Sequence, residues 1–211
     1  IAAVVLGPDG SAIWTSRVAT PRHDYTATLD ALAGLVDAAE RATGPCSVGI
    51  GMPGAVSPAT GLVKNANSIW LNGRPFQIDV EARLDREVRV ANDANCLAMS
   101  EAVDGAAVGA PVVFGVIVGT GTGGGVVVDR RVITGANAIA GEWGHNPLPW
   151  PEAVELPGPE CYCGRRGCLE TWLSGPALSR QFERETGVVG RAEDVVAGAE
   201  AGDAAAAAVL E

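Results

Sequence analysis

The order of apolar and polar positions along the chain predicts strands that alternate with helices. Residues 1–6 and 11–15 are apolar runs on either side of a Gly-Pro-Asp-Gly turn sequence, which predicts an antiparallel hairpin. After Asp24, apolar residues recur at spacings of three and four, namely Tyr25, Leu29, Leu32, Val36 and Ala39. This stripe predicts a helix that Asp24 caps and that ends near Gly44.

The second part of the pattern adds strands on both sides of a further helix. Ser47–Met52 and Val88–Ala91 are short apolar runs typical of strands, and the second is followed at Asn92-Asp93 by a helix that runs to about Val103. Val112–Val118 and Val126–Ile133 are strand-like runs that bracket a glycine-rich loop. Hairpins that feed helices and returning strands indicate an α/β protein with a sheet of mixed direction.

Composition and charge narrow the classes of protein. The 211 residues are 47% hydrophobic and only 19% charged, which is enough for a sizeable core. The formal net charge is -10 and the 15 Lys and Arg residues form no long cluster, so nucleic acid and anionic membranes are poor candidate partners. No secretory signal opens the sequence, which makes the cytoplasm the expected compartment. Both ends interrupt a strand-like or helical run, so we expect a piece of a longer protein.

The glycine-rich loop, Gly119–Gly125, reads Gly-Thr-Gly-Thr-Gly-Gly-Gly and contains the spacing G-x-G-x-x-G. A dinucleotide-binding loop has to open a helix, whereas residues 126–133 are rich in β-branched side chains; a Walker A loop is excluded because no Gly-Lys-Ser/Thr follows. We expect backbone N–H groups and the hydroxyls of Thr120 and Thr122 to contact phosphate. The alternative is a tight hairpin that uses glycine for positive φ.

A second motif has the donor set of a metal centre. Cys161, Cys163 and Cys168 lie within eight residues, and His145 lies upstream in Gly-Glu-Trp-Gly-His. Three thiolates and one imidazole complete a tetrahedral structural zinc shell. One alternative is a disulfide, which is disfavoured because the sequence has no secretion signal and because three thiols cannot all pair among themselves. The other alternative is that the thiols are buried and bind no ligand.

Three carboxylates stand near these motifs. Asp93 follows a predicted strand at a helix start, where α/β proteins often bind ligands, although judged alone it suits a helix N-cap better. Glu142 precedes His145 by three residues, close enough on a helical turn to share a face, and Glu170 follows Cys168 by two. A zinc site adjacent to Glu142 and Glu170 would fix the geometry of both carboxylates without the metal touching the substrate chemistry.

Together these strings resemble one family. The glycine-rich loop, Glu142-Trp-Gly-His145 and Cys161-Tyr-Cys-Gly-Arg-Arg-Gly-Cys-Leu-Glu170, in this order, are similar to the ROK family of bacterial sugar kinases and sugar-responsive repressors. Residues 63–73, 92–98 and 141–150 look most like the fructokinase (mannofructokinase) branch, and the resemblance covers essentially the whole chain. It implies ATP- and Mg²⁺-dependent phosphorylation of a hexose, fructose above all, on an actin-like (ribonuclease-H-like) α/β fold with two lobes and an interlobe cleft.

The resemblance also implies a role for each matching residue. Asp93 would contact the sugar and act as the general base for its attacking hydroxyl. The other sugar ligands would be Asn92, Glu142, His145 and Glu170, with Gly54 and Asn67 beside them. The ATP phosphates would lie against Thr120, Gly121, Thr122 and Gly123. The structural zinc would be held by His145, Cys161, Cys163 and Cys168, and a homodimer is expected.

Two departures from the family pattern limit what is expected of this stretch of sequence. Residues 1–91 would form a first lobe without its opening strand and its Asp-x-Gly-Gly-Thr phosphate string, and residues 92–211 a partial second lobe without the region that closes over adenosine. The chain as printed is therefore expected to bind sugar weakly and to show no turnover. The alternatives are a sugar-sensing repressor with an upstream DNA-binding domain, a kinase for glucose, mannose or N-acetylglucosamine, and a zinc-stabilised segment without ligand.

Overall fold

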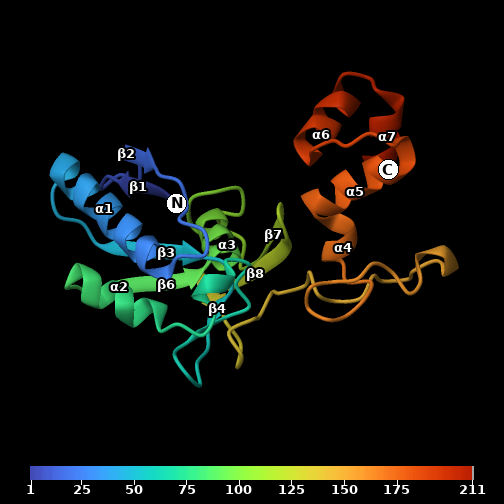
Figure 1. Ribbon diagram of the computed structural model, residues 1–211. Coiled ribbons are helices and arrows are strands. Elements are labelled where there is room, and N and C mark those ends of the chain that lie inside the picture. The colour runs from blue at the N-terminus through green and yellow to red at the C-terminus, as the bar shows by residue number, and fades with distance from the viewer. Residues whose placement is uncertain (211) are drawn as a thin grey trace. The chain divides into compact units, whose positions relative to one another are not determined.

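The computed structural model describes residues 1–210 as two compact units (Figure 1). The first unit contains Ile1–Cys96 and the short segment Gly135–Ile139, and the second contains Leu97–Thr134 and the residues from Ala140 onward. Helix α3, Asp93–Val103, begins in the first unit and continues into the second. The predicted lobes, which divide between residues 91 and 92, stay a prediction.

The first unit opens with the predicted hairpin and helix. Strands β1 (Ala2–Leu6) and β2 (Ala12–Arg17) pair antiparallel, and the turn between them is closed by the amide of Gly10 on the carbonyl of Gly7. Helix α1 (Tyr25–Thr43) packs against both strands (Figure 1). Its first turn is capped by the carboxylate of Asp24, which accepts from the amide of Ala27 at 2.9 Å, and it ends at Gly44 with φ 89°. The capped helix is confirmed.

A parallel strand pair forms the centre of the first unit. Strands β3 (Val48–Met52) and β6 (Val88–Asn92) pair from Val48↔Val88 to Met52↔Asn92. Between them run the small hairpin β4 (Ala55–Val56) and β5 (Val63–Lys64), the 3₁₀ turn η1 (Ile69–Leu71) and helix α2 (Phe76–Leu84). Because the pair is parallel, Met52 and Asn92 end at the same edge, which brings Gly54 and Asp93 to one place.

Apolar side chains on these elements make a core within the first unit. Its fully buried members are Met52, Val63, Ala66, Leu71, Phe76, Val80 and Val88. Burial of each large side chain among them is worth roughly 1.5–3 kcal/mol. The loop between β5 and α2 is therefore anchored by Ala66 and Leu71, although it carries the exposed Asn67.

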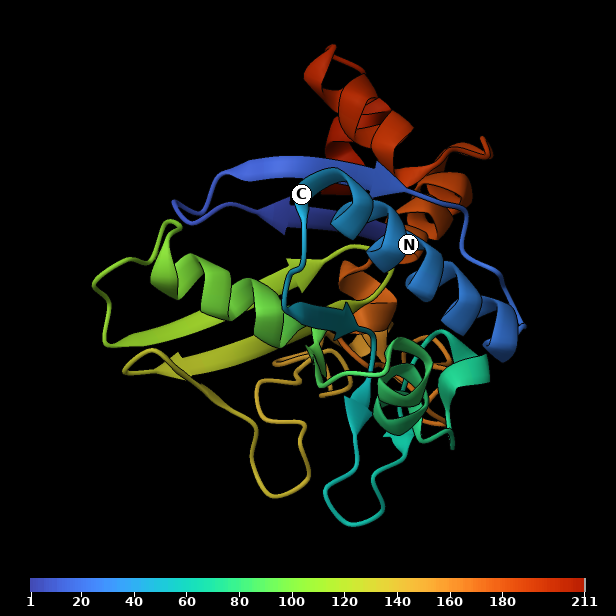
Figure 2. The ribbon, with the colours of Figure 1, turned by 90° about the vertical axis from the view of Figure 1, so that its left-hand side faces the viewer.

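The second unit is built on an antiparallel hairpin. Strands β7 (Val112–Val118), β8 (Thr122–Val128) and β9 (Arg131–Ile133) form one sheet, with β7 and β8 paired from Val112↔Val128 to Val118↔Thr122. Figure 2 shows α3 running along the β7–β8 hairpin. A small core joins them, made of Ala98, Ala102, Val113 and Val127. Parallel and antiparallel pairs both occur among the described residues, but in separate sheets, so the predicted single sheet of mixed direction is wrong.

The prediction that Gly119–Gly125 is all loop is wrong. Only Gly119, Thr120 and Gly121 lie in the turn, because β8 already begins at Thr122. A Cβ atom at Gly124 would lie 2.8 Å from the carbonyl oxygen of Gly141 and 2.9 Å from that of Gly115. The later glycines therefore serve close backbone approach within a strand, which a search for loops by glycine content misses.

Four helices follow the cysteine motif at residues 161–168. They are α4 (Glu170–Leu173), α5 (Gly175–Thr186), α6 (Ala192–Glu200) and α7 (Ala204–Leu210), and the last three pack on one another (Figure 1). The 3₁₀ turn η2 (Ala153–Glu155) precedes them. Ser174 caps α5 by accepting from the amide of Ala177 at 3.3 Å. Within residues 1–210, none of the helices has both the length and the apolar character that a membrane crossing requires.

Candidate functional site

Asp93 stands at the N-terminus of α3 but does not carry the helix cap. The side-chain oxygen of Asn92 accepts from the amide of Asn95 at 3.1 Å, three residues on, which is the capping hydrogen bond. The Oδ1 atom of Asp93 accepts from the adjacent amide of Ala94 at 2.9 Å, and the residue is exposed. The helix cap is therefore Asn92 and not Asp93. The carboxylate of Asp93 lies at the carboxyl end of β6.

Gly54 and the loop that carries Asn67 lie against each other in the same unit. The Nδ2 group of Asn92 donates to the carbonyl of Gly54 at 3.0 Å. Gly54 has φ 75°, and a Cβ atom there would lie 2.6 Å from the amide nitrogen of Ala66 and would also collide with the carbonyl of Lys64. Asn72 holds this loop with both ends of its amide, accepting from the nitrogen and donating to the oxygen of Ala66 at 2.9 and 3.0 Å.

The predicted metal ligands converge in the second unit. The donor atoms of His145, Cys161, Cys163 and Cys168 all lie within 4.8 Å of one another. The Nδ1 atom of His145 lies 3.5 Å from Sγ of Cys161, and the sulfur atoms of Cys163 and Cys168 are 3.6 Å apart. Tetrahedral zinc bonds of about 2.3 Å to sulfur and about 2.0 Å to nitrogen place neighbouring ligands roughly 3.5–3.8 Å apart. The four residues therefore fit a zinc ion, with Nδ1 as the imidazole ligand.

The chemistry of the donor set agrees with this fit. Burial raises the pKa of the Cys161 thiol and raises that of Cys168 to about 12. Thiols give up their protons when a metal binds, so metal binding would release protons into solution. All five cysteines are free thiols in this structure.

The other ring nitrogen of His145 faces Tyr162. Its Nε2 atom lies 3.0 Å from the hydroxyl of Tyr162, and the two rings pack edge to face with centroids 5.1 Å apart. Burial, and then the negative charge of Glu170, raises the pKa of Tyr162 to about 12, so its phenol is neutral at physiological pH. With Nδ1 on a metal, Nε2 carries the proton and acts as a donor.

The segment that carries Glu142 runs along strand β8. A Cβ atom at Gly141 would lie 2.8 Å from the carbonyl of Gly124, and one at Gly144 would collide with the carbonyl of Thr122. Between these glycines, the indole of Trp143 donates to the carbonyl of Gly123 at 2.7 Å. The expectation that Glu142 and His145 share a helical turn is wrong, because this close approach holds residues 141–146 in an irregular segment.

Glu170 reaches the glycine-rich turn. Its Oε2 atom accepts from the amide of Thr122 at 2.9 Å, and a Cβ atom at Gly121 would lie 2.7 Å from the same oxygen. The side chain of Thr122 is only 5% exposed, and its hydroxyl has no hydrogen-bond partner among residues 1–210. Thr120 is exposed at the turn itself. The two threonines are therefore not equivalent, although sequence analysis treats them alike.

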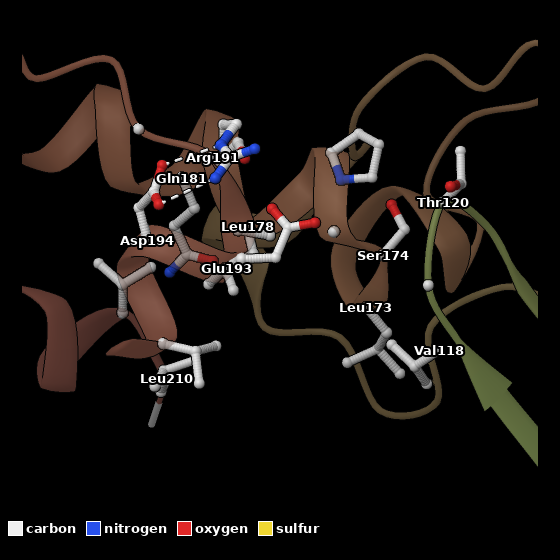
Figure 3. A pocket seen from close by; sticks show the side chains of 18 of the residues that line it. Val118, Thr120, Leu173, Ser174, Leu178, Gln181, Arg191, Glu193, Asp194 and Leu210 are labelled. Atoms are coloured by element: carbon white, nitrogen blue, oxygen red, sulfur yellow. Dashed lines mark hydrogen bonds and ion pairs between the residues drawn. The ribbon is translucent and has the colours of Figure 1, made fainter. Parts of the chain in front are cut away.

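A groove of about 1230 Å³ opens beside Thr120 in the second unit. Its walls come from the end of β7, the turn and helices α4 to α7, and Figure 3 shows Val118, Leu173 and Leu210 on its apolar side. Glu193 points into the groove, while Arg191 and Asp194 form an ion pair with N–O distances of 3.0 and 3.2 Å. Its volume is large enough for a nucleotide. The groove cannot be predicted from the sequence, because helical amphipathicity does not show which helix faces stay unpaired.

The predicted site residues thus form two groups, one in each unit. Gly54, Asn67, Asn92 and Asp93 belong to the first, and Glu142, His145, Glu170, the turn and the cysteines belong to the second. Asn72 and Trp143 are two structurally important residues that the sequence patterns do not indicate. Both stand next to a glycine, and for Trp143 that neighbour, Gly144, is crowded by the backbone of Thr122.

Comparison with known proteins places these features in a family. The ROK family matches residues 1–211. An N-acetyl-D-glucosamine kinase of Escherichia coli O6:H1 is 42% identical over 204 residues, which are 94% of this chain and 67% of that protein. A ROK family glucokinase from Streptomyces griseus, solved with glucose and AMPPNP, superposes with a TM-score of 0.84 at 29% identity. The superposition covers 99% of this chain and 70% of the glucokinase chain.

A ROK family transcriptional regulator, a homolog of the Escherichia coli MLC protein, shares the fold, with a TM-score of 0.81 at 23% identity over 99% of this chain and 55% of that chain. This chain thus spans about two thirds of the curated kinase and about half of the regulator. Its α/β fold is the actin-like, ribonuclease-H-like fold that the sequence resemblance implies. The chain belongs to the ROK family of proteins.

Proposed function

We propose that this protein transfers the γ-phosphoryl group of ATP to a hydroxyl group of a hexose, with Asp93 as the general base. The observation that carries the proposal is the division of labour at the start of α3. Asn92 supplies the helix cap, and the exposed carboxylate of Asp93 stands beside it at a strand end. Phosphoryl transfer needs alignment, charge neutralisation and one group that accepts the proton of the attacking hydroxyl.

N-acetylglucosamine is the first candidate substrate. The support is that the curated relative with 42% identity is an N-acetyl-D-glucosamine kinase. Fructose, which the strings around Asn67, Asn92 and Trp143 favour in the sequence, is the second candidate, and its preference is not confirmed. From the family resemblance, the proposed sugar ligands are Asn92, Asp93, Glu142, His145 and Glu170, together with Gly54 and Asn67.

The nucleotide would lie in the second unit. Its phosphates would meet Thr120, Gly121, Thr122 and Gly123, and its nucleoside would enter the groove beside Thr120. When bound, Mg²⁺ supplies positive charge to the phosphate oxygens. A structural zinc on His145 and the three cysteines would hold the polypeptide on which Glu170 stands. The cytoplasmic location and the homodimer stay predictions.

A coupled assay that follows ADP formation in the full-length protein tests the proposal. N-acetylglucosamine, glucose, mannose and fructose are compared at equal concentration, and the highest kcat/KM identifies the substrate. Sugar binding by calorimetry without ADP formation from any of the four would instead favour a sugar-sensing regulator.

A further inference from the structure

We propose that Glu170 positions the phosphate-binding turn and thereby couples sugar binding to nucleotide binding; this inference rests on the proposed function. Its starting point is the hydrogen bond from the amide of Thr122 to Oε2 of Glu170 at 2.9 Å. Hydrogen bonds to an ionised acceptor are the stronger kind. The approach is possible only because residue 121 is glycine, since a Cβ atom there would lie 2.7 Å from the same oxygen.

The backbone beneath Glu170 is fixed by the segment that carries His145. The amide of Glu170 donates to the carbonyl of Gly144 at 2.8 Å, and the amide of Leu169 donates to that of Asn146 at 2.9 Å. The two acceptors, Gly144 and Asn146, are the sequence neighbours of His145. The two donors, Leu169 and Glu170, directly follow Cys168. A metal ion on His145 and Cys168 would therefore tie the two segments together at the base of the carboxylate.

The turn is held at its other end as well. The carbonyl of Gly119 accepts from the amide of Gly175 at 2.8 Å, and the amide of Gly119 donates to the carbonyl of Gly121. Glu170 is the first residue of the four-residue helix α4, and Gly175, five positions on, is the first residue of α5, so six consecutive residues hold both ends of the turn. The turn therefore cannot shift without moving Glu170 or the start of α5.

A carboxylate has two oxygen atoms and can serve two partners. Oε2 holds the amide of Thr122, and a sugar hydroxyl that donates to the same carboxylate would restrict its rotation. A sugar that orders Glu170 would then order the turn for phosphates, and nucleotide binding would favour the sugar by the same factor. Without this link, Glu170 would act on sugar affinity alone, or its negative charge would weaken nucleotide binding.

The experiment is a binding cycle on the full-length, zinc-loaded protein. Calorimetry gives the Kd of N-acetylglucosamine and of a non-hydrolysable ATP analogue, each alone and with the other ligand at saturation. In the wild type each ligand should tighten the other at least about fivefold. Glu170→Asp, which withdraws the carboxylate by one methylene, and Gly121→Ala, which crowds it, should both bring this factor close to one. The matched control, Thr120→Ala, should weaken nucleotide binding and keep the factor.

Hydrogen exchange of the Thr122 amide supplies an independent readout. Exchange should be slow in the wild type, slower with sugar and at least about tenfold faster in Glu170→Asp. The inference is overturned if both variants keep the coupling factor and the slow exchange, or if Glu170→Asp tightens nucleotide binding. A wild type that binds neither ligand would instead refute the proposed function, whereas one that binds both without coupling would refute only the role of Glu170.

Discussion

The side chain of Asn92 accepts a hydrogen bond from the amide of Asn95 at 3.1 Å and so caps α3. Of the two adjacent residues, Asn92 therefore stabilises the helix, and Asp93 is left for the proposed chemistry. Asp93→Asn should lower kcat of the full-length protein at least about a hundredfold, because a general base contributes on that order, while sugar affinity survives. Steady-state kinetics and sugar calorimetry check this.

The matched variant is Asn92→Ala, which removes the cap and should cost about 1 kcal/mol of folding free energy. Thermal unfolding of both variants separates the roles. If Asp93→Asn unfolds earlier than Asn92→Ala while keeping full activity, the carboxylate is a structural cap after all.

Zinc content tests the cluster around His145. We expect about one zinc ion per chain by elemental analysis of protein purified without chelator, because the four donor atoms lie within 4.8 Å of one another. Cys168→Ser should lose the metal. Cys96→Ser is the control that should keep it, since Cys96 lies outside the cluster. Absence of zinc from the wild type, or equal loss in both variants, would disprove the site.

Gly54 and Gly61 offer a matched pair of positive-φ glycines. Their φ angles are 75° and 70°. A Cβ atom at Gly54 would collide with the backbone of Lys64 and Ala66, whereas a Cβ atom at Gly61 would meet no other atom of the described residues within 4 Å. Gly61→Ala should cost roughly 1–2 kcal/mol from backbone strain. Gly54→Ala should cost about 1–3 kcal/mol more from overpacking and should also raise KM for the sugar. Denaturant unfolding and kinetics measure both, and equal costs would show that the collision is relieved.

Both tyrosines should titrate above the ordinary value near 10. Tyr25 donates to Asp79 at 2.6 Å, and burial, followed by this hydrogen bond, raises its pKa. A raised pKa in the folded state means that the stabilisation by Tyr25 is complete below pH 10 and is lost as pH rises beyond it. Absorbance titration of Tyr162→Phe isolates Tyr25, and Tyr25→Phe should flatten the loss of stability above pH 10. A Tyr25 transition at or below pH 10 would contradict the burial argument.

Local patterns carry much of the fold. The helix from Tyr25 to Thr43 is predicted to within a residue because its stripe, its Asp24 cap and its terminal Gly44 all agree. The convergence of His145 with three cysteines is also predictable, since residue types and short spacings define the donor set. These features depend on neighbours in the sequence.

Features that depend on contacts between distant parts of the backbone cannot be predicted from the sequence pattern. Gly123 to Gly125 look like a loop until Gly141 and Trp143 are seen lying against them. The carboxylate of Glu170, expected to serve a sugar, is also engaged with Thr122, 48 positions away. Neither contact leaves a periodic trace, because each depends on one atom reaching one amide or carbonyl.

The glycine content of β8 has a consequence for how the chain folds. Three consecutive glycines lose more backbone entropy on ordering than other residues and bring no side chains to the hairpin. The outer half of β8, near Val126–Val128, pairs with valine-rich β7 and can form early, whereas the half near Thr122 gains its anchors only when residues 141–144 and Glu170 dock. We therefore expect the glycine-rich end of the hairpin to be among the last parts of the second unit to become ordered, and among the first to loosen.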